Sequence, residues 1–100
     1  MINQVNREEA LKLIAENKNN AQFIIIDVRT PKEFEQQHLP QALNINIYDP
    51  DFKEQILKLN QRKTYLIYCK SGGRSSHATE MMEELGFRHI YNINYLSLTS

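Results

Sequence analysis

The stretch "FIIIDV", residues 23–28, constrains the fold more than any other part of the chain. It is a continuous apolar run rich in β-branched residues, which is typical of a strand buried on both faces, as in parallel sheets. Thr30, Pro31 and Glu33 follow with the spacing of the N-cap, N1 and N3 positions of a helix. A buried strand followed at once by a helix indicates a βαβ unit.

The same alternation recurs along the chain. Asn6 and Glu9 have the spacing of a capping box before a helix over about residues 7–17, and Gly86 is typical of a left-handed residue after a helix end. Asp49 and Pro50 begin a helix whose expected buried side is Phe52, Ile56, Leu57 and Leu59. The other expected elements are strands at 2–5, 42–47, 64–68 and 89–93, a helix ending near 37 and a helix at 75–85.

Strands that alternate with helices over short connections predict an α/β fold. We expect a five-stranded, mainly parallel sheet with helices on both faces. One hundred residues fit one small domain, so residues 1–100 are expected to form it alone.

Two polar stretches follow strands of this predicted sheet. They are "DVR", Asp27 to Arg29, and the loop from Cys69 to Arg74. Ligands of open parallel sheets bind beyond the carboxyl ends of the strands, so both stretches fall where a site is expected.

The loop after Cys69 has the composition of an anion-binding cup. Gly72 and Gly73 allow backbone N–H groups to turn inward, and a helix N-terminus contributes about half a positive charge. Lys70 and Arg74 add cations, and Ser71 and Ser75 add hydroxyl donors. A cysteine beside such donors is expected to have a lowered pKa and therefore a larger thiolate fraction at neutral pH.

Composition excludes several other classes. Lys plus Arg and Asp plus Glu number 12 each, so no basic surface predicts nucleic-acid binding. One cysteine cannot form an internal disulfide or a structural zinc site, and we expect no metal or cofactor. No apolar run is long enough to predict a membrane span or a signal peptide, so a reducing cytoplasm is the expected location.

Two segments together resemble the signature of the rhodanese-like sulfurtransferase family. They are "IIIDVRTPKEFEQQHLPQALNI" and "YLIYCKSGGRSSHATEMMEELGFRHIYNI". The resemblance implies the family's five-stranded parallel sheet. It also implies that Cys69 is a nucleophile, which takes sulfane sulfur from thiosulfate or another persulfide donor. Its persulfide would then pass the sulfur to cyanide, a thiol or a protein acceptor.

The resemblance also assigns roles around Cys69. The active loop would be formed by Lys70, Ser71, Gly72, Gly73, Arg74 and Ser75. Asp27 and Arg29 match the family's Asp-Val-Arg, whose side chains tie strand ends and loop together. Arg74 is expected to bind a substrate oxyanion, with a pair to Asp27 or Glu33 as the alternative.

The chain departs from the family pattern in two places. Gln37 and Gln41 of "QHLPQA" replace the two glycines of Gly-His-Ile-Pro-Gly-Ala. Since glutamine disfavours positive φ, the backbone of this loop is expected to adjust. The closing "NINYLSLTS" lacks the Gly-Gly of many members, and the chain has no Trp. Tyr95 and Leu96 in its place predict an altered rim and a lower activity.

Two other functions compete with sulfur transfer. One is a non-catalytic or redox-sensing module, which needs only an exposed thiol of low pKa. The other is a cysteine phosphatase, whose loop is Cys-x5-Arg. Cys69 and Arg74 have the shorter Cys-x4-Arg spacing, which suits a single sulfur atom better than a tetrahedral phosphate.

Overall fold

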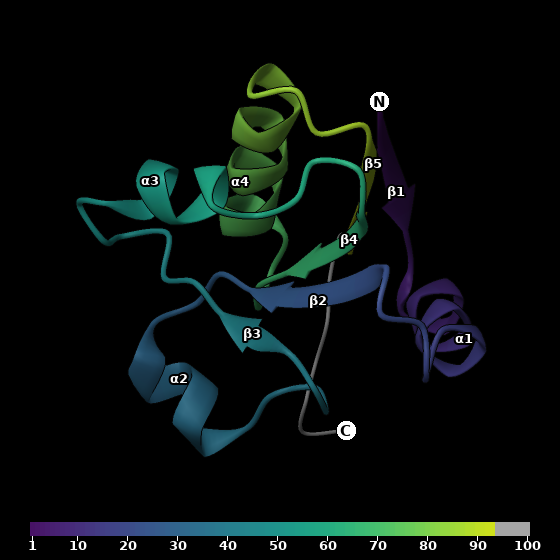
Figure 1. Ribbon diagram of the computed structural model, residues 1–100. Coiled ribbons are helices and arrows are strands. Elements are labelled where there is room, and N and C mark those ends of the chain that lie inside the picture. The colour runs from purple at the N-terminus through teal and green to yellow at the C-terminus, as the bar shows by residue number, and fades with distance from the viewer. Residues whose placement is uncertain (94–100) are drawn as a thin grey trace.

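A computed structural model describes residues 1–93 of the chain. Five strands form one sheet in the order β1-β5-β4-β2-β3, and each neighbouring pair is parallel (Figure 1). The strands are β1 (Ile2–Val5), β2 (Phe23–Asp27), β3 (Leu43–Asn44), β4 (Thr64–Tyr68) and β5 (His89–Ile93). The predicted α/β architecture is therefore confirmed.

Helices cover both faces of the sheet. α1 (Arg7–Glu16) and α2 (Pro31–Gln36) lie on one side of it, and α3 (Phe52–Leu57) and α4 (Gly73–Glu84) on the other (Figure 1). Alternate residues of a strand point to opposite faces, and the two cores divide accordingly. Ile26 and Ile67 pack toward α3 and α4, whereas Ile25 and Leu66 pack with residues of α1.

Local signals place the helix ends where the sequence predicts them. Asn6 with Glu9, and Thr30 with Glu33, both form reciprocal capping boxes. Gly86 follows α4 with a φ of 102°. Such caps satisfy backbone groups that lack partners inside the helix, which is why they mark its ends.

Three elements differ from the prediction. β3 has two residues instead of six. The amides of Ile45 and Ile47 still donate to the carbonyls of Asp27 and Val28. The Asn46 side chain, however, accepts from the Tyr48 amide, and the chain bends there. α3 begins only at Phe52, and Leu57 is 50% exposed rather than buried. α4 begins at Gly73, two residues earlier than expected.

The loop before β3 contradicts the expectation that its backbone would avoid positive φ. Gln41 has a φ of 66°. The Ala42 amide donates to the Leu39 carbonyl, which closes a four-residue turn with Pro40 and Gln41 at its centre. Proline followed by a residue of positive φ is the pattern of a type II turn. The turn is thus kept although its glycine is not.

The longest helix is α4, with 12 residues. Within residues 1–93 no helix is long and apolar enough to cross a membrane. The closing segment, with Tyr95 and Leu96, lies outside the described residues.

Candidate active site

The two polar stretches meet at the carboxyl ends of adjacent strands. Asp27 is the register partner of Tyr68, and the Val28 amide donates to the Tyr68 carbonyl at 3.2 Å. Cys69 therefore follows β4 directly beside the Asp-Val-Arg stretch, which begins at the last residue of β2. The site lies at the rim of the sheet where parallel-sheet proteins bind ligands.

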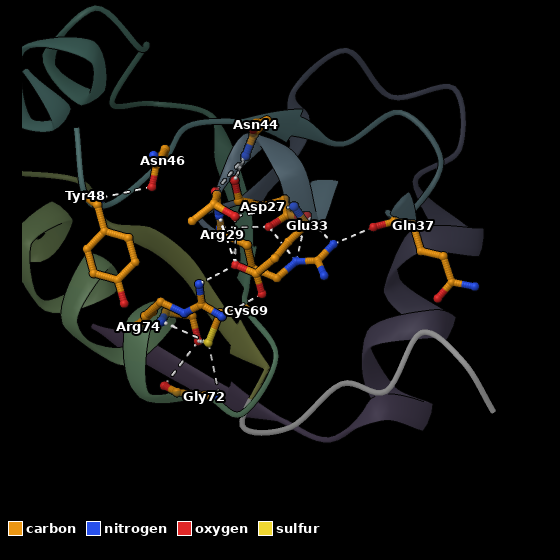
Figure 2. A network of polar contacts seen from close by, with 12 residues as sticks. Asp27, Arg29, Glu33, Gln37, Asn44, Asn46, Tyr48, Cys69, Gly72 and Arg74 are labelled. Carbon is orange, nitrogen blue, oxygen red and sulfur yellow. Dashed lines mark hydrogen bonds and ion pairs between the residues drawn. The ribbon is translucent and has the colours of Figure 1, made fainter. Parts of the chain in front are cut away.

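Backbone donors converge on the sulfur of Cys69. The amides of Gly72 and Ser75 donate to Sγ at 3.1 and 3.3 Å, and the Ser75 hydroxyl lies 3.4 Å from it (Figure 2). Gly72 takes a φ of 91°, which turns the loop back over the sulfur and is open to glycine without steric cost. The amide of Ser75 belongs to the first turn of α4, where N–H groups lack helical partners.

The Cys69 thiol combines burial with strong hydrogen bonding. Its residue is 1% exposed and borders the core beneath α4, so burial works to raise the thiol pKa. The Ser75 hydroxyl and the amides of Ser75, Gly72 and Ser71 outweigh that effect, and the pKa is lowered from its ordinary value. The predicted acidic cysteine thus has a structural cause in amides that favour the thiolate.

The rest of the loop divides into buried and exposed residues. Ser75 is fully buried and its hydroxyl donates to the Gly72 carbonyl at 3.2 Å, which closes the loop on itself. Lys70, Ser71 and Gly73 are exposed. Ser71 acts on the Cys69 thiol through its backbone amide, which contributes to the lowered pKa.

Arg74 pairs with Glu33 rather than standing free for an anion. Its two terminal nitrogens donate to the two carboxylate oxygens at 2.7 and 3.0 Å. Hydrogen bonding from Arg74 lowers the pKa of Glu33 to about 2. The guanidinium carbon also lies 5.9 Å from the ring centre of Tyr48. Of the alternatives predicted for Arg74, the structure has the pair with Glu33.

Asp27 and Arg29 form a second, more deeply buried pair. Arg29 Nη2 lies 2.8 Å from Asp27 Oδ2, and the two residues are 7% and 0% exposed. Arg29 also donates to the Gln37 carbonyl. Asn44 donates to the carbonyls of both Asp27 and Arg29 at 3.0 Å. This network ties the end of β2 to α2 and β3 (Figure 2).

Three residues of the site were not identified from the sequence. The Tyr68 hydroxyl accepts from the buried Leu39 amide at 3.0 Å and so holds the loop before β3 against β4. Burial raises the pKa of Tyr68, which stays protonated. Asn44 and Tyr48 carry no sequence signal, because their roles depend on which loops the sheet brings together. Within residues 1–93, no three His, Cys, Asp or Glu side chains are placed to hold a metal ion.

Comparisons with known proteins agree with this geometry. The chain is 35% identical over 69 residues to thiosulfate sulfurtransferase PspE of Escherichia coli, a match covering 67% of the chain. It spans 64% of that protein, less than two thirds of its length. It is 27% identical over 93 residues to thiosulfate sulfurtransferase GlpE of Coxiella burnetii, covering 93% of the chain and 81% of the relative.

Solved structures show the same arrangement. A rhodanese-like domain protein from Staphylococcus aureus superposes with a TM-score of 0.76 at 25% identity, covering 93% of this chain and 85% of that one. The family model described as "Rhodanese-like domain" matches residues 6–95. On the strength of that match and of the shared fold, this chain belongs to the rhodanese-like domain family.

Proposed function

We propose that the protein is a sulfurtransferase that carries sulfane sulfur as a persulfide on Cys69. The Cys69 thiolate attacks the outer sulfur of thiosulfate, a new S–S bond forms, and sulfite leaves with the electron pair of the broken S–S bond. Cyanide or a thiolate then attacks the outer sulfur of the persulfide. Thiocyanate or a new persulfide is released, and the Cys69 thiolate returns.

The observation that carries this proposal is the convergence of donors on one sulfur atom. The amides of Gly72 and Ser75 donate to Cys69 Sγ at 3.1 and 3.3 Å, and the Ser75 hydroxyl lies 3.4 Å from it. Donors that stabilise the attacking thiolate also stabilise it as the leaving group when the sulfur moves on to the acceptor. Both half-reactions use the same donors. The names of the relatives PspE and GlpE support the same reaction class.

The burial of Cys69 sets a condition on the reaction. The residue is 1% exposed, so a donor reaches its sulfur only when the loop over it opens. Lys70 and Ser71 lie at the exposed side of this loop.

The decisive experiment measures intact mass after incubation with thiosulfate. We expect a gain of one sulfur atom, lost again when cyanide or a small thiol is added. Cys69→Ser abolishes the gain. Ser76→Ala is the matched control: the neighbouring helix residue has no hydrogen bond to the sulfur within residues 1–93, and the gain should persist.

Each competing function gives a different result. A mass that stays unchanged with thiosulfate, while Cys69 is readily oxidised by peroxide, would identify a redox-sensing module. Hydrolysis of an aryl phosphate faster than sulfur transfer would refute the argument from loop length. Sulfur transfer that survives in Cys69→Ser would place the nucleophile elsewhere.

A further inference from the structure

Both guanidinium groups near Cys69 are already neutralised by carboxylates of the protein. Arg29 is held by Asp27, and Arg74 is held through two hydrogen bonds by Glu33 (Figure 2). Bidentate pairing uses the donor geometry that would otherwise bind an oxyanion such as the sulfonate end of thiosulfate. The Arg74 side chain, which the loop could offer to an anion, is therefore already bound to a carboxylate of the protein.

Lys70 is the cation that remains beside the sulfur in sequence. It is exposed, and no ion pair involves it within residues 1–93. An exposed ammonium in water attracts an anion weakly, since solvent and salt screen it. A dianionic donor approaching the Cys69 thiolate thus meets a negative nucleophile whose nearby arginines are both neutralised, beside the partial positive charge of the loop amides and of the start of α4.

We propose that Glu33 is a specificity-determining residue, whose pair with Arg74 directs the site toward sulfur donors with a single negative charge or none and away from dianions. This rests on the proposed sulfur transfer through Cys69. The favoured donor class is a persulfidated thiol. There the Cys69 thiolate takes the outer sulfur of a protonated persulfide, the donor's S–S bond breaks, and the donor thiolate leaves with its electron pair. Cys69 then holds that sulfur with its proton.

Glu33→Gln tests the proposal with little disturbance of the fold. A glutamine at N3 of a helix still completes a capping box, so its side-chain oxygen can accept from the Thr30 amide as Glu33 does. The change removes the charge that neutralises Arg74 and one of the two oxygens that accept from its guanidinium. Glu35→Gln is the matched control, because Glu35 lies on the same helix, is exposed, and forms no ion pair within residues 1–93.

Two sulfur donors of different charge measure the effect of Glu33→Gln on substrate binding. Thiosulfate carries two negative charges, and benzenethiosulfonate transfers the same kind of outer sulfur with one. Coulomb energy is proportional to the product of the charges, so the fold-change for a dianion is about the square of that for a monoanion. In Glu33→Gln we expect KM to fall about tenfold for thiosulfate and about threefold for benzenethiosulfonate, with changes below about twofold in Glu35→Gln.

A measurement on the unaltered protein covers the case in which Glu33→Gln is unstable. Salt weakens repulsion between like charges, so kcat/KM for thiosulfate should rise with ionic strength and change less for benzenethiosulfonate. Equal KM changes for the two donors, no change in Glu33→Gln, or a thiosulfate rate that falls with salt would each overturn the role of Glu33. If thiosulfate, benzenethiosulfonate and a persulfidated thiol all fail to add sulfur to Cys69 in every variant, the proposed function itself is refuted, and this inference with it.

Discussion

Gln41 offers a direct test of how backbone strain is stored beside the site. It has a φ of 66° at the third position of the turn over residues 39–42, where the family pattern has glycine. Gln37 replaces the other glycine of the same pattern, but its φ is −158°, which is extended backbone open to any residue. Both side chains are exposed, so shortening either removes little packing. The same substitution at these two positions should therefore have opposite effects.

The magnitude follows from two opposing free energies. A left-handed backbone costs an ordinary L-residue about 1–2 kcal/mol, which glycine does not incur. Glycine loses more conformational freedom on folding, which costs about 0.5–1 kcal/mol. Gln41→Gly should raise the free energy of unfolding by about 0.5–1 kcal/mol. At Gln37 only the entropy cost remains, so Gln37→Gly should lower it by about 0.5–1 kcal/mol.

Thermal unfolding followed by circular dichroism, with urea titration at one temperature, measures both variants against the parent. A difference of 1 kcal/mol in a chain of this size shifts Tm by about 4–8 °C, so the two variants should separate clearly on either side of the parent. A Gln41→Gly variant that melts with or below the parent would show that the left-handed backbone is not strained. Destabilisation of similar size in both variants would show that the change in stability comes from the conformational entropy of glycine alone.

Three further outcomes follow from the site. Ser75→Ala removes the hydroxyl that favours the Cys69 thiolate, so the pKa of Cys69 should rise, and the pH midpoint of its alkylation rate should move upward; an unmoved midpoint would contradict this. Arg74 lowers the pKa of Glu33 to about 2, so the stability from this pair is present above pH 4.5 and lost as the pH falls toward 2. Between these two pH values, the free energy of unfolding measured with urea should change by about 1 kcal/mol less in Glu33→Gln than in the parent. Asp27→Asn leaves the Arg29 guanidinium buried without a counter-charge and should cost about 3–5 kcal/mol in urea unfolding, whereas a loss below about 1 kcal/mol would mean that the pair is not effectively buried.

Much of the fold could be predicted because its signals are local. An apolar run such as residues 23–28 predicts a strand buried on both faces, and a capping box such as that of Asn6 and Glu9 predicts where a helix starts. The elements that were predicted poorly depend on distant neighbours. β3 is cut to two residues where Asn46 bends the chain, and Leu57 is left exposed although Ile56 beside it is fully buried.

The candidate site also has a part that local sequence predicts and a part that depends on distant residues. Cys69 and its loop could be identified because the donors to the sulfur come from residues three and six positions later in the chain. The partner of Arg74 could not be decided from the sequence, since Glu33 lies 41 positions away, and Asp27 met the same chemical requirement. The fold resolves this by burial. Asp27 at the end of β2 is already enclosed with Arg29, whereas Glu33 lies in the first turn of α2, where its carboxylate is partly exposed and pairs with Arg74. The charge beside Cys69 is therefore set by the pairing of β2 with β4, which brings Glu33 in the first turn of α2 within reach of Arg74 at the start of α4, and not by the composition of the cysteine loop alone.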